Sequence, residues 1–89
     1  MIYLFIRQTV VDYGRWKEAF DTHLAARQAG GATAEALVLH NVEDSSEVIL
    51  VLGWRNLAQA RLFTQSISWQ QALQHMGTVG LPEVRFLEG

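Results

Sequence analysis

Residues 48–52 read VILVL, five apolar residues in succession, and this stretch decides the fold. The polar run EDSSE at 43–47 precedes it directly, and the mixed segment ALVLHNV at 36–42 precedes that run. Apolar, β-branched segments bounded by polar turn residues are typical of strands, and a short polar cluster between two of them is typical of a hairpin. The sequence therefore predicts two antiparallel strands, Ala36–Val42 and Val48–Leu52.

A second continuous apolar run, IYLFI, occupies residues 2–6 and belongs to an expected strand over Ile2–Thr9. A strand with one face in water alternates apolar and polar residues, whereas this run and VILVL do not alternate. Both faces of these two strands must be covered.

A first helix is expected between the first two strands. Asp12 is a suitable N-cap, apolar residues recur at helical spacing over Tyr13–Ala29, and Gly30 and Gly31 end the segment. The glycine pair is explained as a helix end and turn. No further glycine or lysine follows at the spacing of a phosphate-binding loop.

Two further helices and a strand complete the chain. Asn56 with Gln59, and Ser68 with Gln71, have capping-box spacing. They predict helices near residues 57–66 and 69–76, the second closed by Gly77. The last extended segment, Leu81–Leu87, contains the only proline near its start.

The element order is βαββαβ, with the second helical region divided in two. It predicts an α+β fold in one domain, residues 1–89: a four-stranded antiparallel sheet in the order 4-1-3-2 with helices on one face. The two continuous apolar strands lie in the middle of this order. A chain of 89 residues has nothing left to cover the opposite face, so we expect a homodimer through the sheet face.

The composition excludes several classes of function. The chain has no cysteine, 49% hydrophobic and 18% charged residues, and a formal charge of -2. It can form neither disulfides nor thiolate sites, and it has no basic stripe for nucleic acid. The apolar run at the N-terminus is too short to span a membrane, and no basic residue precedes it as in a signal peptide. A cytoplasmic protein with no membrane and no nucleic-acid partner is expected.

The most informative local pattern lies on the first helix. On a helical wheel, Trp16 and Phe20 define the apolar face, and His23 and Arg27 fall at its centre. In a structural interpretation, His23 bonds a backbone carbonyl, and Arg27 packs its methylenes on the core and reaches water or a carboxylate. In a functional interpretation both line a pocket, His23 as proton acceptor or donor and Arg27 as partner of a phenolate, carboxylate or enolate oxygen.

The remaining aromatic and histidine residues allow fewer conclusions. Trp16, Trp54 and Trp69 could flank one flat ligand, although core packing is the better explanation for at least two of them. His40 in an edge strand and His75 near a helix end are expected at the surface. No pair of histidines has short metal-ligand spacing, so no metal site is expected.

The sequence as a whole resembles the dimeric α+β barrel superfamily, in particular its small antibiotic-biosynthesis-monooxygenase-like members. The resemblance spans nearly the whole chain and rests on the element order and on scattered residues. These are Asp12, Tyr13, Trp16, Lys17, Phe20, Asp21, His23, Arg27, Trp54, Ala60, Phe63, Ser66, Trp69, Gly77, Gly80, Pro82 and Phe86.

The resemblance implies a ferredoxin-like domain that pairs into a dimeric barrel, with a pocket between helices and sheet for a small apolar or aromatic ligand. It implies cofactor-free monooxygenation or isomerisation of an aromatic, polyketide-like molecule; the alternative is a non-catalytic ligand-binding or stress-related module. The expected catalytic residues are His23 and Arg27. The expected ligand-binding residues are Trp16, Phe20, Trp54, Phe63 and Trp69. Haem-degrading relatives carry an asparagine and a histidine where Gln8 and Leu73 stand, which argues against haem.

Overall fold

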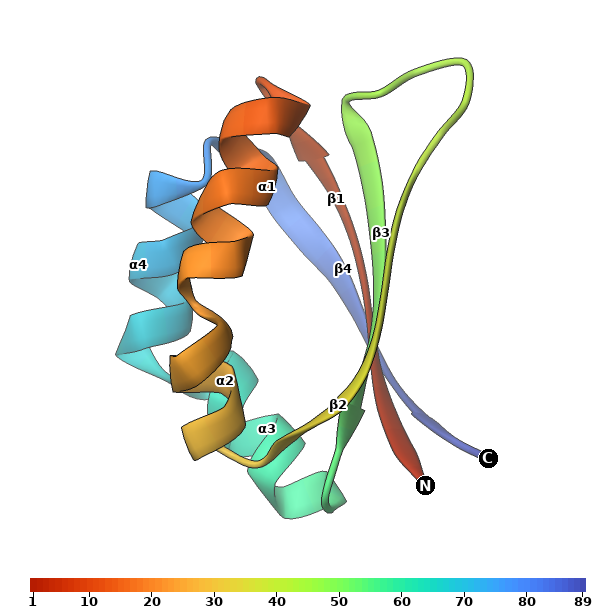
Figure 1. Cartoon of the computed structure of the whole chain (residues 1–89), viewed down its shortest axis with the longest axis vertical. Coiled ribbons are helices and arrows are strands. Elements are labelled where there is room, and N and C mark those ends of the chain that lie inside the picture. Colours follow the sequence, from red (N-terminus) through yellow and green to blue (C-terminus); the bar gives the residue numbers. More distant parts are fainter.

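The computed structural model describes residues 1–89 and contains one four-stranded sheet with all helices on one face (Figure 1). The strands are β1 (Ile2–Val10), β2 (Ala32–His40), β3 (Glu47–Trp54) and β4 (Thr78–Glu88), and the helices are α1 (Tyr13–Thr22), α2 (Leu24–Ala29), α3 (Leu57–Gln65) and α4 (Ile67–His75). The sheet order is β2-β3-β1-β4 and every neighbouring pair is antiparallel. The predicted α+β, ferredoxin-like topology is confirmed.

The two continuous apolar runs form the central strands, as expected. β1 pairs with β3 along its length, and the side chains that alternate toward the helices are buried. With the apolar faces of the helices they form a single core, whose members are Leu4, Ile6, Val10, Trp16, Phe20, Val48, Leu50, Leu52, Trp54, Ala60, Trp69, Ala72 and Met76.

The first helical segment differs from the prediction, because the expected continuous helix is broken at His23 into α1 and α2. The backbone N–H of His23 bonds the carbonyl of Phe20, three residues back, at 3.2 Å. This tightened last turn ends α1, and a new short helix then starts in a different direction. The N-cap is as predicted, since the Asp12 carboxylate accepts the N–H of Arg15 at 3.0 Å.

The second strand lies earlier in the chain than predicted, at Ala32–His40 instead of Ala36–Val42. Gly31 has a φ of 115°, a conformation that glycine adopts readily, so the chain turns from α2 straight into the sheet. The last strand is also longer than expected and begins at Thr78. Gly80, with a φ of 70°, lies in an irregular stretch opposite Arg7–Thr9 that the pairing tolerates.

Helix α4 begins two residues before its predicted start because Ser66, and not Ser68, is its N-cap. The Ser66 hydroxyl accepts the N–H of Trp69 at 3.1 Å and donates to the carbonyl of Phe63 at 2.7 Å. One side chain therefore links the end of α3 to the start of α4. The other predicted cap is confirmed, with Asn56 accepting the N–H of Gln59 at 2.8 Å.

The face of the sheet turned away from the helices, the outer face, is apolar at its centre on β1, β2 and β3 and carries Glu83 and Arg85 on β4. The register places Val51 between Phe5 and Leu37, with Ile49 next to Leu39. Leu37 and Leu39 are about half exposed, and no helix covers this face (Figure 1). An ion pair between Arg7 and Glu47 lies at one end of it.

The two chain termini lie side by side (Figure 1), and the terminal amino group of Met1 donates to the carbonyl of Gly89 at 2.9 Å. None of the helices is long and apolar enough to cross a membrane.

Candidate functional site

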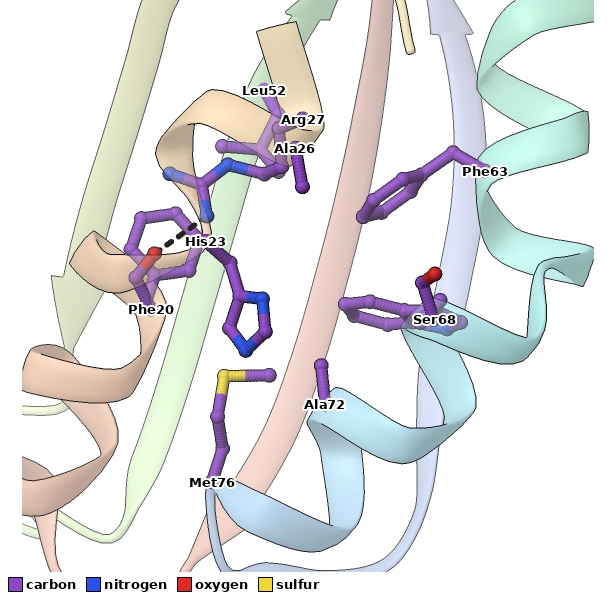
Figure 2. Close-up of a pocket in the computed structure, with 10 residues that line it drawn as sticks. Phe20, His23, Ala26, Arg27, Leu52, Phe63, Ser68, Ala72 and Met76 are labelled. Carbon is purple, nitrogen blue, oxygen red and sulfur yellow. Dashed lines mark hydrogen bonds between the residues drawn. The ribbon is translucent and has the colours of Figure 1, made fainter. Parts of the chain in front are cut away.

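A cavity lies inside the helix layer, where α1 and α2 face α3 and α4 above strand β3. Its wall is mostly apolar and consists of Phe20, His23, Ala26, Arg27, Leu52, Phe63, Ser68, Trp69, Ala72 and Met76. Figure 2 shows His23 and Arg27 on one side of the cavity, with Phe63 and Ser68 on the other and Met76 at one end. The cavity volume is about 30 Å³, room for one or two water molecules and less than an aromatic ring requires.

His23 occupies the break between α1 and α2, and its half-buried imidazole points toward Met76 (Figure 2). The nitrogens of the ring make no hydrogen bond with another residue of the cavity wall. His23 also lines a polar surface groove together with Arg15, Glu18, Thr22 and His75. The ring therefore separates an apolar cavity from a polar groove that is open to solvent.

Arg27 is the charged group of the cavity, and only 6% of the residue is exposed. One guanidinium nitrogen, Nη1, donates to the carbonyl of Phe20 at 2.6 Å (Figure 2), and the guanidinium carbon lies 3.7 Å from the centre of the Phe20 ring. Burial lowers the pKa of the Arg27 guanidinium from its ordinary value because desolvation disfavours the charged form. The negative charge of Asp21 opposes that shift only in part.

The aromatic residues form two groups on opposite sides of the cavity. On the α1 side, Trp16 stacks on Phe20 with ring centres 5.1 Å apart. On the other side, the ring of Phe63 packs against those of Trp69 and Trp54, with ring centres 5.1 and 4.8 Å apart respectively. A flat ligand that entered the cavity would thus meet aromatic rings on two sides.

Comparison with solved structures assigns this arrangement to a known fold. A protein from Bordetella bronchiseptica described as a candidate antibiotic biosynthesis monooxygenase superimposes with a TM-score of 0.83 at 14% identity, over 99% of this chain and 95% of that one. SnoaB, a cofactor-independent oxygenase from Streptomyces nogalater, superimposes with a TM-score of 0.75 at 13% identity, over 99% of this chain and 91% of that one. A candidate antibiotic biosynthesis monooxygenase from Nitrosomonas europaea superimposes with a TM-score of 0.74 at 12% identity, over 100% of this chain and 98% of that one.

The chain has the antibiotic-biosynthesis-monooxygenase-like fold. The resemblance inferred from the sequence is therefore confirmed at the level of the fold. No model of a protein family matches the sequence. No curated protein sequence matches it either. At these identities the relatives establish the architecture, and activity has to be argued from the site of this chain.

The structure brings together five of the seven residues singled out from the sequence. His23, Arg27, Phe20, Phe63 and Trp69 all line the cavity. Trp16 and Trp54 do not, since both are almost fully buried in the core, one ring behind the wall. Their indole Nε1 atoms have no hydrogen-bond partner.

Several wall residues were not singled out from the sequence. Met76 and Ala72 fall within the helix expected near residues 69–76, and Leu52 falls within an expected strand. Ser68 was expected to be a helix cap, but it is the second residue of α4 and lines the cavity. The spacing of Ala72 and Met76, four residues apart and three and seven residues after Trp69, was the available signal for a shared helix face.

The other polar candidates lie away from the cavity. Gln8 faces the helices and is 3% exposed; its side-chain oxygen accepts the Thr78 hydroxyl at 3.2 Å, and its Nε2 has no partner. His40 is exposed on β2 and packs against Tyr13 at 4.7 Å, and His75 is exposed in the last turn of α4, as predicted for both. No group of three or more His, Asp or Glu side chains is arranged to hold a metal ion.

Proposed function

We propose that the cavity binds a small, largely apolar aromatic molecule and that the chain acts on it without a cofactor, by proton abstraction followed by monooxygenation or isomerisation. The observation that carries this proposal is the placement of one imidazole and one guanidinium in the wall of an otherwise apolar, aromatic-lined cavity. Pockets of this composition, with few polar groups among apolar ones, are typical ligand sites.

The two polar side chains suit the two tasks of such a reaction. His23 would remove a proton from a carbon next to a carbonyl group, because imidazole accepts protons near neutral pH. Arg27 would stabilise the negative oxygen of the enolate, in an environment whose low polarity strengthens that attraction.

The carbanion can then follow either of two routes, and in both the atoms and electrons are accounted for. In monooxygenation it transfers electrons to dioxygen; one oxygen atom becomes the new carbonyl oxygen of the former methylene carbon and the other leaves as water. In isomerisation the protonated His23 returns the proton to a different carbon, and no oxidant is consumed.

The cavity must open before a ring can enter, given its volume of about 30 Å³. Two of its wall residues, Arg27 and Met76, have long unbranched side chains that can adopt other rotamers at small energetic expense. The polar groove beside His23 gives the imidazole a route to exchange its proton with solvent while the ligand occupies the cavity.

The outer face supports the second part of the proposal, a homodimer. Phe5, Leu37, Leu39, Ile49 and Val51 form a continuous apolar surface across three strands, as the register shows. A second copy stacked on this face would bury roughly 1,500 Å² or more in total, in the range of stable interfaces. The charged side chains of Arg7 and Glu47 would lie toward the rim.

A second candidate function is a non-catalytic module that sequesters the same kind of ligand. One observation favours it: no residue of the wall holds the His23 imidazole in a fixed orientation. General bases in enzymes are usually oriented by a hydrogen bond from a third group.

The substitution His23→Ala tests the catalytic role. With a tricyclic aromatic ketone that has an acidic methylene group, oxygen uptake, or proton exchange in deuterated water, should fall on the order of 100-fold or more. The far-UV circular dichroism and the oligomeric state should not change, because His23 is only partly buried and does not belong to the hydrophobic core.

His40→Ala is the matched control, since this histidine lies on β2 outside the cavity wall. It should retain the wild-type rate. A His23→Ala protein that kept its rate within about twofold would rule out this base. A wild-type protein that carried a bound aromatic molecule in native mass spectrometry but never turned it over would favour the sequestering module.

A further inference from the structure

Arg27 is a buried cation without an anionic partner. Only 6% of the residue is exposed, and no carboxylate lies within ion-pair distance of its guanidinium; the ion pairs of the chain join Arg7 with Glu47, Lys17 with Asp21, and Arg85 with Glu83. Charged side chains are rarely buried to this degree without an opposite charge.

Two carboxylates near Arg27, those of Asp21 and Glu35, are already engaged. Asp21 accepts from Lys17 at 2.7 and 2.8 Å, and Glu35, on β2, accepts from the hydroxyl of Tyr3 at 3.2 Å. The Phe20 ring and the Phe20 carbonyl offset part of the desolvation of Arg27, yet neither carries a net charge.

A structural role does not explain this arginine. Its one hydrogen bond to the wall goes to the carbonyl of Phe20, and that carbonyl already accepts the backbone N–H of His23 at 3.2 Å. Methionine, with a similar length and no charge, could fill the same space beside the Phe20 ring. These contacts leave the positive charge of Arg27 without a compensating charge inside the chain, and the guanidinium lies in the wall of an apolar cavity.

We propose that the ligand of this cavity is an aromatic carboxylate, with its carboxylate group paired to the Arg27 guanidinium and its ring between Phe20 and the Phe63–Trp69 pair. Nη1 is the only guanidinium nitrogen with a hydrogen-bond partner in the chain, so Nε and Nη2 remain free to form two parallel hydrogen bonds once a change of rotamer directs them into the cavity. The planar guanidinium matches the carboxylate in this geometry better than it matches a single oxygen.

This inference rests on the proposed function in one respect, namely that the cavity is a ligand site. It differs in the group that Arg27 binds: the guanidinium pairs with a carboxylate that the ligand carries before any reaction, in place of the enolate oxygen. The pairing would compensate a cation that is uncompensated in the free protein, so that much of the binding free energy would come from one contact.

The test compares 2-naphthoate with its neutral isostere 2-naphthamide by isothermal titration calorimetry. Wild-type protein should bind the acid on the order of 10- to 100-fold more tightly than the amide. Arg27→Met should remove that preference and leave the affinity for the amide within about threefold. Arg27→Lys should keep a weaker preference, because a lysine supplies the charge without the planar fork.

Two further measurements separate charge recognition from a structural role. Arg55→Met, a change at an exposed arginine outside the cavity wall, should leave both affinities unchanged. The thermal midpoint of Arg27→Met without ligand should equal or exceed that of the wild type, because an unpaired buried charge is removed. A clear fall in that midpoint would contradict the assignment of a ligand-binding charge.

The remaining outcomes distinguish this inference from the proposed function. If the amide binds as tightly as the acid, or if the preference for the acid survives in Arg27→Met, the carboxylate inference is overturned while the cavity remains a ligand site. If wild-type protein binds neither compound at millimolar concentration, both the inference and the proposed function fail.

Discussion

Val51→Lys is expected to abolish dimerisation at micromolar concentration. Val51 lies at the middle of the outer face, between Phe5 and Leu37, and would be buried against the second copy. A two-fold axis would bring two new lysines into the same apolar interface, each without a partner, so the dimer should weaken on the order of 100-fold or more. Sedimentation velocity measures the change directly.

The control for this prediction is Val42→Lys. Val42 is 96% exposed in the turn between β2 and β3, away from the paired strands, so this variant should sediment like the wild type. A Val51→Lys protein that remained dimeric would show that the outer face is not the interface. A wild-type protein that was a stable monomer at the same concentration would contradict the proposed dimer altogether.

Trp16→Ala is expected to cause the largest loss of stability among single substitutions in the core. The side chain is fully buried and packs between Tyr13 and Phe20, with ring centres 5.8 and 5.1 Å away. Removing a buried aromatic side chain lowers the free energy of unfolding by about 3–5 kcal/mol, whereas small domains have only about 5–15 kcal/mol in total. Urea denaturation followed by circular dichroism gives the free energy of unfolding.

The milder variant Trp16→Phe separates packing from ligand binding. It keeps a ring next to Phe20 and removes an indole nitrogen that has no hydrogen-bond partner, so it should lose clearly less stability than Trp16→Ala. Its affinity for an aromatic ligand should stay close to that of the wild type, because Trp16 lies behind the cavity wall. A loss of less than about 1 kcal/mol in Trp16→Ala would contradict its place in the core.

The sheet could be predicted from the sequence because its determinants are local and redundant. VILVL and IYLFI are apolar without alternation, which identifies them as central strands before any contact is known. The element order then leaves a single simple arrangement, and the structure confirms it.

The helices were harder to delimit because tertiary contacts decide their ends. The apolar spacing from Tyr13 to Ala29 is continuous, and nothing in it marks the break at His23. Ser68 has a glutamine at the capping-box position and Ser66 has not, yet Ser66 caps α4 because its hydroxyl also reaches the carbonyl of Phe63.

The candidate site was only partly predictable for a related reason. The helical wheel placed His23 and Arg27 on the buried face, and both line the cavity. The same pattern could not separate the wall residue Phe20 from the core residue Trp16, because both lie on that face. Whether an aromatic ring lines a cavity or lies behind it depends on how α1 and α4 sit opposite each other, and periodicity within one helix does not contain that information.

The central claim is that the space enclosed by the helices and the sheet takes up aromatic ligands, and the methionine methyl groups test it most directly. The chain has two methionines: Met76 is 4% exposed in the cavity wall, and Met1 is 54% exposed at the N-terminus. In protein labelled with ¹³C at these methyl groups, addition of 2-naphthoate should shift the Met76 resonance saturably and leave that of Met1 in place. A Met76 resonance that stays unchanged up to millimolar ligand would contradict the claim.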